Sequence, residues 1–200
     1  MGKITIIYLV AYLAGSINFA IIFFKLTGKA DPRSSFSGNA GTTNVYRQAG
    51  YFWATVILLL DIGRAVGVAA LAVYYLEGRY LPWVGFFLVL GNSFPCFHNF
   101  RGGKGVANYL GFTFLIAPGA ALASAAIWLI AYGIGRITFI ASFFMVFTLA
   151  LGQTLTLHWK FSAVAGAAAT FFLILFNHRK NIIEYWSGNG PAAPGGESKR

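Results

Sequence analysis

The sequence predicts an all-helical protein that crosses a membrane several times. Of its 200 residues, 58% are hydrophobic and only 10% are charged, whereas charged residues make up about a quarter of an average soluble chain. Long apolar runs recur along the chain, most of them near the roughly 20 residues that a helix needs to cross a bilayer. The single cysteine excludes an internal disulfide. We therefore expect a polytopic membrane protein with seven transmembrane helices.

The first apolar run, Ile4–Phe24, is expected to be an uncleaved membrane helix. Lys3 would suit a signal peptide, but no small-x-small cleavage site follows the run. Glycine, serine, asparagine, threonine and arginine interrupt the apolar pattern over Lys25–Gly50. That composition predicts a long polar loop after the first crossing.

The second run, Tyr51–Leu76, contains two charged side chains, Asp61 and Arg64. Residues three apart lie on one face of a helix, so an ion pair within the membrane is expected in preference to a direct ligand role. A third run, Pro82–Phe97, is expected to cross next.

A glycine-rich segment, which we call the glycine-lysine loop, follows the third run: Phe100–Gly105 reads Phe-Arg-Gly-Gly-Lys-Gly. The glycines lack Cβ atoms, so backbone N–H groups can crowd around a ligand beside the compact positive charge of Lys104. That donor set suits a phosphate. Gly105 stands where a Walker A loop has serine or threonine, so the loop is not of that type.

The fourth run, Val106–Ala117, has only twelve residues before Pro118, about 18 Å of helix against a hydrocarbon core of roughly 30 Å. As a separate crossing it would begin below the membrane surface and place the glycine-lysine loop in a protected pocket. The alternative is one proline-kinked helix over Val106–Gly133, which gives six crossings. The remaining spans are expected over Gly119–Gly133, Thr138–Leu157 and Trp159–Phe176.

The distribution of basic residues favours seven crossings with the N-terminus outside and the C-terminus in the cytoplasm. The outside segments then keep only Lys3, Arg79 and Lys160, as the positive-inside rule requires. Six crossings would put Arg136 and His178–Lys180 outside. Because the basic residues are spread among the loops, the net charge of +10 indicates orientation and anionic partners, and no nucleic-acid partner is expected.

The end of the chain changes character after the last apolar run. Ile182, Ile183, Tyr185 and Trp186 among polar neighbours predict a short interfacial helix. Residues 189–200 are expected to be a disordered tail, which leaves 1–188 as a single integral-membrane domain. No internal repeat is visible, which disfavours an inverted-repeat transporter.

Several catalytic patterns are absent from the sequence. It contains no Gly-x-Ser-x-Gly elbow, no His-x-x-x-x-Asp pair and no Cys/His cluster, so no metal or other cofactor is expected. The predicted cytoplasmic loops instead offer hydroxyls, amides and cations with few carboxylates, which suits a doubly charged phosphate and an acyl oxygen. This pattern favours an enzyme whose substrate arrives already activated.

Four segments carry a resemblance to a known family. Gly15–Ile17, Ser37–Arg47, Phe94–Ala107 and His178–Ile182 resemble, in order and spacing, the acyl-phosphate-dependent glycerol-3-phosphate acyltransferases of bacteria, the PlsY type. The resemblance covers nearly the whole chain to about Gly188. It implies a seven-helix enzyme of the bacterial inner membrane, with its active site facing the cytoplasm. Such an enzyme transfers a fatty acyl group from acyl phosphate to the 1-position of glycerol 3-phosphate, giving lysophosphatidic acid and phosphate.

The same resemblance implies the site residues and partners. Lys104, Ser37 and Asn39 are expected to be catalytic. Substrate phosphate is expected to be held by Arg47, Ser142, His178, Asn181, Gly102, Gly103 and Gly105, with the neighbouring loop shaped by Gly41, Thr43 and Asn44. The partners are then glycerol 3-phosphate, acyl phosphate and membrane lipid, while the acyl-chain preference and the oligomeric state stay open.

Five positions depart from the residues typical of that family. Phe36 and Asn92 stand where glycine and histidine are usual, Arg64 and Arg101 replace lysine, and Asn108 replaces a small threonine or serine. These departures and the basic pocket leave two alternatives to the active enzyme. One is a carrier or channel for organic phosphates, and the other is a catalytically weak, lipid-binding paralogue.

Overall fold

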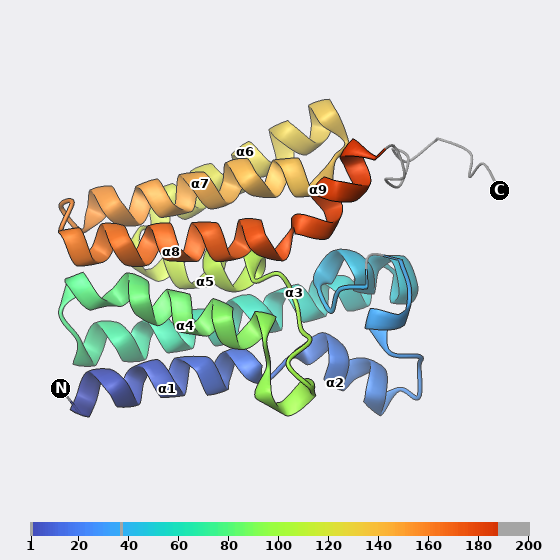
Figure 1. The fold of residues 1–200 in the computed structure, drawn as a ribbon, viewed down its shortest axis with the longest axis horizontal. Coiled ribbons are helices and arrows are strands. Elements are labelled where there is room, and N and C mark those ends of the chain that lie inside the picture. The colour runs from blue at the N-terminus through green and yellow to red at the C-terminus, as the bar shows by residue number, and fades with distance from the viewer. Residues whose placement is uncertain (1, 37, 188–200) are drawn as a thin grey trace.

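The computed structural model describes residues 2–36 and 38–187, and every regular element within them is a helix. The helices lie side by side along one long axis, with the N-terminus at one end and α9 at the other (Figure 1). The all-helical class predicted from the sequence is therefore confirmed for the described residues.

The first apolar run forms two helices, α1 (Gly2–Ser16) and α2 (Phe19–Leu26), in place of the one continuous helix that the sequence predicts. The break lies at Ile17 and Asn18. The Oδ1 atom of Asn18 accepts the backbone N–H of Ile21 at 3.0 Å, which caps the new helix. An asparagine favours such a cap over the interior of a helix because its short side chain competes for backbone N–H groups.

The expected polar loop is partly helical. A short 3-10 helix, η1 (Pro32–Ser34), precedes α3 (Thr42–Tyr75), which includes residues that the sequence assigns to the loop. Gly50, at φ 84° and ψ 178°, interrupts α3 at the boundary predicted between loop and span. The eight residues before Gly50 are helical because Val45 and Asn44 are buried against the rest of the bundle, which the local polar composition did not indicate.

The next segment forms η2 (Gly78–Tyr80), α4 (Leu81–Ser93) and η3 (Cys96–His98). Beyond the glycine-lysine loop, α5 (Val106–Ile116) and α6 (Pro118–Gly135) are separated by Ala117 alone and pack against each other. The single kinked helix over residues 106–133 is therefore wrong. The short helix expected after the loop is confirmed.

The last part of the bundle consists of α7 (Thr138–Thr156), α8 (Phe161–Asn177) and α9 (Arg179–Trp186), with a bend of 49° between α8 and α9. The helix predicted around residues 182–186 is confirmed as α9. Its Trp186 side chain is exposed. The tail predicted over 189–200 lies outside the described residues.

Length and composition identify which elements can cross a membrane. Five described stretches are long and apolar enough, and a sixth is reached only if the bent pair of α8 and α9 counts as one span. The five are Gly2–Leu26, Thr42–Tyr75, Gly78–His98, Pro118–Gly135 and Thr138–Thr156. α5 is shorter than these, in keeping with its expected recessed position. Outward-facing side chains such as Ile6, Leu59 and Phe172 are each more than 60% exposed, which suits a lipid surface.

Close contact between α1 and α4 depends on two glycines. A Cβ atom on Gly15 would lie 2.1 Å from the carbonyl oxygen of Leu88, and one on Gly91 would lie 2.0 Å from that of Tyr12. Small residues allow membrane helices to approach closely where no water drives them together. The Tyr12 hydroxyl extends the contact by donating to the Phe94 carbonyl at 2.9 Å. This pairing holds the end of α4, and hence the start of the glycine-lysine loop.

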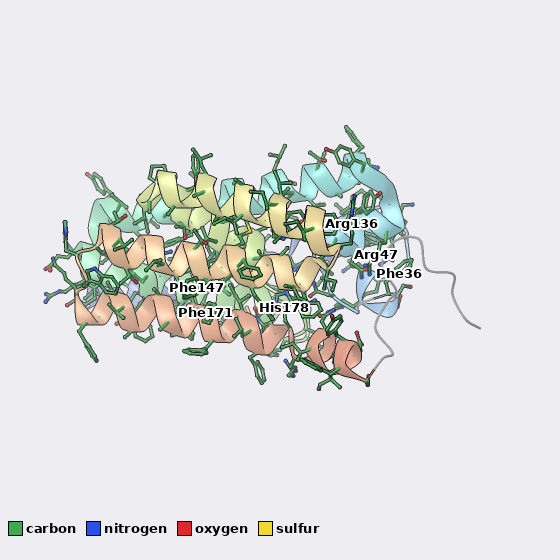
Figure 2. All side chains as sticks on the ribbon, turned by 90° about the horizontal axis from the view of Figure 1, so that it is seen from above. Phe36, Arg47, Arg136, Phe147, Phe171 and His178 are labelled. Atoms are coloured by element: carbon green, nitrogen blue, oxygen red, sulfur yellow. The ribbon has the colours of Figure 1, made fainter. Side chains whose placement is uncertain are left out.

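The polar segments collect at one end of the bundle. The tip of α2, the turn between α6 and α7, and α9 lie there, while the glycine-lysine loop stops short of that end (Figure 1). Arg47 and Arg136 lie at the same end, in the view turned by 90° (Figure 2). The site is therefore assembled from segments far apart in the sequence.

Candidate functional site

The glycine-lysine loop is fixed by its own backbone against the end of α4. The N–H of Gly102 donates to the Ser93 carbonyl at 3.1 Å, and that of Gly103 donates to the Asn92 carbonyl at 2.9 Å. A Cβ atom at Gly102 would lie 2.0 Å from the Asn92 oxygen, so only glycine fits there. Gly105, at φ 87°, ends the loop and caps α5.

Lys104 extends from this loop towards α9. Its Nζ donates to the Oδ1 atom of Asn181, 77 residues away. Asn177 supports the same contact from the end of α8, because its Nδ2 donates to the Ser93 hydroxyl at 2.7 Å and to the Lys104 carbonyl at 3.4 Å. Lys104 and Asn181, both predicted from the sequence, thus meet directly. Asn177 was missed, and its only signal is its place directly before His178.

The charge of Lys104 depends on its surroundings. Burial lowers the pKa of Lys104 to about 8, the Glu184 carboxylate on α9 opposes that shift, and the Arg47 guanidinium adds to it. Arg47 is therefore near enough to act on Lys104 electrostatically, although it lies on the first turns of α3. Glu184 was also missed by the sequence reasoning. Its signal is the helical spacing from Asn181, which places both on one face of α9.

His178 is buried at the junction of α8 and α9, with 3% of its surface exposed. Its Nδ1 lies 2.8 Å from the Ile174 carbonyl, which can only accept, so Nδ1 carries the proton. Burial and the nearby Lys104 charge lower the pKa of His178 to about 4. The ring is therefore neutral near pH 7, with the lone pair of Nε2 free to accept. It stacks edge-on against Phe143 of α7, with ring centroids 5.3 Å apart.

The segment before α3 lies against the glycine-lysine loop. The N–H of Ala40 donates to the Gly102 carbonyl at 3.4 Å. The buried Asn44 organises this segment, because its Nδ2 donates to the carbonyls of Pro32 at 2.5 Å, Asn39 at 3.0 Å and Ser35 at 3.2 Å.

The other predicted residues of this segment differ in their placement. Thr43 is exposed on the first turn of α3. A Cβ atom at Gly41 would lie 2.8 Å from the Nδ2 atom of Asn39. Ser37, predicted to be catalytic, lies outside the described residues.

Phe36 adopts a left-handed backbone conformation, with φ 54°. This is the conformation that glycine adopts without strain, and glycine is the residue typical of the resembled family at this position. The exposed Phe36 ring faces the Arg47 guanidinium, with 5.9 Å from its Cζ to the ring centroid (Figure 2). The aromatic side chain thus packs against Arg47, which is predicted to bind substrate phosphate.

Ser142 lies on α7, near the start of that helix. Its hydroxyl donates to the Thr138 carbonyl at 2.9 Å and accepts from the indole N–H of Trp128 at 3.2 Å. Ser142 shares its end of the bundle with the site but is engaged with α6 and α7. To donate a hydrogen bond to substrate, the Ser142 hydroxyl would have to give up its hydrogen bond to the Thr138 carbonyl.

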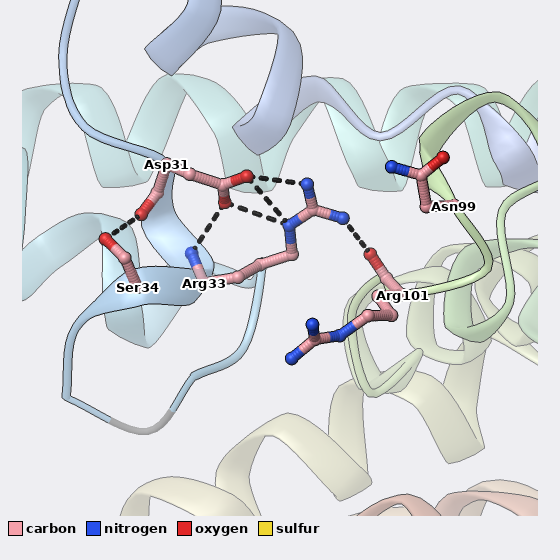
Figure 3. Close-up of a pocket in the computed structure, with 5 residues that line it drawn as sticks. All are labelled: Asp31, Arg33, Ser34, Asn99 and Arg101. Carbon is pink, nitrogen blue, oxygen red and sulfur yellow. Dashed lines mark hydrogen bonds and ion pairs between the residues drawn. The ribbon is translucent and has the colours of Figure 1, made fainter.

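Arg33 links the η1 segment to the glycine-lysine loop and to the residues just before it. It pairs with Asp31 at 2.6 Å, and its Nη1 donates to the carbonyls of His98 at 2.9 Å and Arg101 at 2.7 Å. A shallow pocket of about 270 Å³ opens beside this contact, lined also by Ser34 and Asn99 (Figure 3). Lys104 is not part of its lining. The Arg33 contact therefore joins the η1 segment to the loop without entering the predicted site.

Together these residues form a donor-rich site. Lys104, Asn181 and Arg47 supply charge and N–H donors, while His178 supplies an acceptor in its neutral form. Among the described residues, no group of three or more His, Cys, Asp or Glu side chains is placed to hold a metal. The arrangement can bind and orient a phosphorylated substrate and stabilise negative charge that develops near Lys104.

Comparisons with known proteins agree over nearly the full length. A family model described as glycerol-3-phosphate acyltransferase matches residues 5–188. The chain belongs to the glycerol-3-phosphate acyltransferase family. A glycerol-3-phosphate acyltransferase of Pseudomonas fluorescens is 39% identical over 183 residues, which cover 89% of this chain and 93% of the relative. One from Pseudomonas putida is 37% identical, with coverage of 90% and 94%.

Solved structures of this family have the same fold. The crystal structure of PlsY, an integral membrane glycerol 3-phosphate acyltransferase, matches in its glycerol 3-phosphate form with a TM-score of 0.87. The two sequences are 32% identical, and the match covers 94% of each chain. The lysophosphatidic acid form matches with a TM-score of 0.84 at 31% identity. The resemblance stated from the sequence motifs is thereby confirmed.

Three of the departures from the typical family residues have a structural explanation. Asn92 is 3% exposed, and its Nδ2 lies 2.8 Å from the position that a Cβ atom on Gly103 would occupy. Its side chain packs against Gly103, and its carbonyl accepts the Gly103 N–H, so Asn92 supports the backbone of the glycine-lysine loop. Arg64 and Asn108, both of them departures, contact each other at 2.6 Å. The predicted ion pair of Asp61 and Arg64 is confirmed at 2.8 Å.

Proposed function

We propose that this member of the glycerol-3-phosphate acyltransferase family transfers a fatty acyl group from acyl phosphate to the 1-position hydroxyl of glycerol 3-phosphate. The products are lysophosphatidic acid and inorganic phosphate. The observation that carries the proposal is the contact between Lys104 and Asn181, which joins the glycine-lysine loop to the segment containing His178. Family membership and the donor-rich chemistry of this junction support it.

The proposed chemistry requires no covalent enzyme intermediate. An acyl phosphate is a mixed anhydride with a good leaving group, so the enzyme needs mainly to orient the glycerol hydroxyl against the acyl carbonyl. The hydroxyl oxygen forms the new ester bond, the carbonyl carbon releases phosphate, and a substrate phosphate oxygen takes the hydroxyl proton. Lys104 and the loop amides stabilise the negative charge that develops.

Within this scheme each predicted residue has a defined task. Lys104, Ser37 and Asn39 act at the reacting groups, and Arg47, Asn181 and Ser142 hold phosphate with the loop glycines. His178 can donate to phosphate only when it is protonated, and a bound dianion favours that form. In its neutral form it accepts from a glycerol hydroxyl through Nε2.

We further propose seven crossings in the bacterial inner membrane, with the site facing the cytoplasm. α5 forms the recessed crossing, and α8 forms the last. Among the described residues, most basic side chains come from segments at or near the end of the bundle that holds the site (Figure 1), as the positive-inside rule requires of the cytoplasmic side. These segments are the tip of α2, the chain from there to the first turns of α3, the glycine-lysine loop, the turn between α6 and α7, and α9. Their basic residues are Lys25, Lys29, Arg33, Arg47, Arg101, Lys104, Arg136, Arg179 and Lys180.

One assay tests the activity and its donor. The purified protein in lipid is given labelled glycerol 3-phosphate with acyl phosphate, acyl-CoA or acyl carrier protein as donor, and lysophosphatidic acid is measured. We expect product from acyl phosphate alone, and a loss of about 100-fold or more in Lys104→Ala. Lys29→Ala, an exposed lysine at the same end, is the matched control. Near-normal turnover in Lys104→Ala would overturn the active-site assignment.

The same preparation separates the two alternatives. Uptake of glycerol 3-phosphate into vesicles without any acylated product would identify a carrier. Phosphate binding that is lost in Lys104→Ala, with no product from any donor, would identify a lipid-binding paralogue without activity.

A further inference from the structure

Arg64 is the centre of a buried polar cluster beneath the glycine-lysine loop. Its side chain is 8% exposed, in the middle of α3. One terminal nitrogen, Nη2, donates to Asp61 Oδ1 at 2.8 Å and to Asn108 Oδ1 at 2.6 Å. The other, Nη1, donates to the backbone carbonyl of Ile17. One guanidinium thus joins α3 to α5 and to the break between α1 and α2.

The Ile17 carbonyl is available because the first span is broken. In a continuous helix this oxygen would accept the N–H four residues later, that of Ile21. The Asn18 side chain takes that N–H instead, at 3.0 Å. The Phe19 ring, directly after the break, lies 5.0 Å from the Arg64 Cζ atom, which suits a cation–π contact. The break therefore creates an acceptor that Arg64 occupies.

Asn108 connects this cluster to the site. It lies in the first turn of α5, four residues after Lys104, with the left-handed Gly105 between them. Four residues are about one helical turn. Holding the Asn108 side chain therefore holds the start of α5 and with it the adjoining loop, from which Lys104 extends towards Asn181.

We propose that Arg64 is a positioning residue for acyl transfer: by bridging Ile17, Asp61 and Asn108, it fixes the start of α5 and so the direction of Lys104. This inference rests on the proposed function, since it assigns Arg64 a role in that reaction. Arg64 touches no reacting atom in this role.

The chemistry of the cluster requires a guanidinium. A lysine at position 64 would keep the charge opposite Asp61, but a single ammonium cannot present the planar fork that reaches three acceptors at once. The net stability from a buried ion pair is small, because desolvation offsets the attraction, and a well-packed apolar pair can replace it. A mutation can therefore remove the positioning of α5 by Arg64 while leaving the stability of the protein nearly unchanged.

The experiment compares three variants with wild type: Arg64→Lys, Asn108→Ala, and the double substitution Asp61→Leu/Arg64→Met. The matched control is Thr113→Val/Gln153→Leu, which removes another buried polar link of α5, from Gln153 Nε2 to Thr113 Oγ1 at 2.7 Å, farther from the loop. For each protein in lipid, kcat, KM for glycerol 3-phosphate and thermal stability are measured.

A second readout does not depend on activity. Cys96 is the only cysteine in the sequence, and its N–H donates to the Ser16 hydroxyl at 3.3 Å, beside the break and ahead of the glycine-lysine loop. The rate at which a maleimide modifies Cys96 therefore reports how often this segment moves away from α1 and exposes the thiol. Loosening of the Arg64 cluster exposes the cysteine more often.

We expect all three Arg64-cluster variants to lose about 10- to 100-fold in kcat, with a smaller change in KM, and to show faster Cys96 modification than wild type and control. The double substitution is expected to keep the wild-type melting temperature. Wild-type kcat and labelling in Arg64→Lys and in the double variant would overturn the proposal. Equal effects in the control would also overturn it, because they would indicate general loosening of α5.

The two proposals can fail separately. If wild type gives no acylated product, the proposed function fails, and faster Cys96 modification confined to the three cluster variants still supports positioning of the loop by Arg64. If wild type is active but the variants match it in both readouts, the positioning role alone fails.

Discussion

Lys104 and Asn181 form a hydrogen bond between segments 77 residues apart, and this bond closes the candidate site. Lys104 comes from a loop whose shape is set by glycine, whereas Asn181 comes from the first turns of α9. Their contact unites charge from one segment with amide groups from the other.

Removing the Asn181 amide is expected to weaken the reaction without unfolding the protein. Asn181→Ala should lower kcat/KM for glycerol 3-phosphate about 10- to 100-fold, equivalent to the roughly 1.5–3 kcal/mol of a hydrogen bond to a charged group. Steady-state kinetics measure the effect. Lys180→Ala, an exposed neighbour on α9, should stay near wild type. A kcat/KM in Asn181→Ala equal to that of Lys180→Ala would contradict the role of the contact.

The activity is expected to decline in alkaline solution as Lys104 loses its proton. The pKa of Lys104 is lowered by burial to about 8. The charged form is therefore complete well below pH 8 and is lost as pH rises through that value. The Glu184 carboxylate raises this pKa, so Glu184→Gln should move the alkaline limb of the kcat/KM profile to lower pH.

Glu77→Gln provides the control for that shift. Glu77 pairs with Arg79 at 3.1 Å in the turn between α3 and α4. That turn lies at the opposite end of the bundle from α9 (Figure 1). Its replacement should leave the limb in place. An alkaline limb that does not move in Glu184→Gln would show that Glu184 does not act on Lys104.

A methyl group on Gly102 is expected to displace the glycine-lysine loop. The added Cβ would lie 2.0 Å from the Asn92 carbonyl oxygen and 2.7 Å from the Pro95 ring, so backbone would have to move. Gly102→Ala should cost about 1–3 kcal/mol of stability and reduce kcat by a larger factor. Thermal melts and kinetics measure both. Gly63→Ala on α3, where the structure leaves open space, should melt no lower than wild type.

The Phe36 ring is expected to steady Arg47. Phe36→Ala removes the cation–π contact, worth about 0.5–1 kcal/mol at an exposed site, but keeps a Cβ atom and so keeps the backbone strain at φ 54°. KM for glycerol 3-phosphate should rise about 2- to 5-fold with little change in kcat. An unchanged KM would show that Arg47 needs no support from this ring. Phe97→Ala, another exposed phenylalanine near the loop, is the control.

Much of the fold follows from local pattern, and the errors have physical causes. Apolar runs and their interruptions predicted most helices closely, including the short α5, and they placed the boundary between loop and span at Gly50, where the structure interrupts α3. The break at Asn18 was missed because one asparagine in an apolar run is a weak signal, and its effect depends on the Ala40 carbonyl that its side chain also contacts. The helical turns before Gly50 were missed because their burial comes from distant segments.

In the candidate site, too, some features follow from local sequence and others from contacts between distant segments. Gly102, Gly103 and Lys104 can be predicted from the sequence as a phosphate-binding loop, because the residue types themselves determine backbone freedom and charge. The roles of Asn177, Glu184 and Arg33 come from contacts between segments that no local pattern reveals. The motif order pointed to the family, and it also marked Arg64 and Asn108 as departures. Their contact with each other became visible only in three dimensions.

Composition and short patterns are enough to predict the all-helical membrane class, the glycine-lysine loop and the family. The contacts between distant segments emerge only in the folded bundle: α5 packs against α6, Lys104 contacts Asn181, and Arg64 bridges Ile17, Asp61 and Asn108. The physical reason is that polar partners in an apolar bundle are selected by helix packing. Segments far apart in the chain can satisfy one another's hydrogen bonds only after the helices have come together.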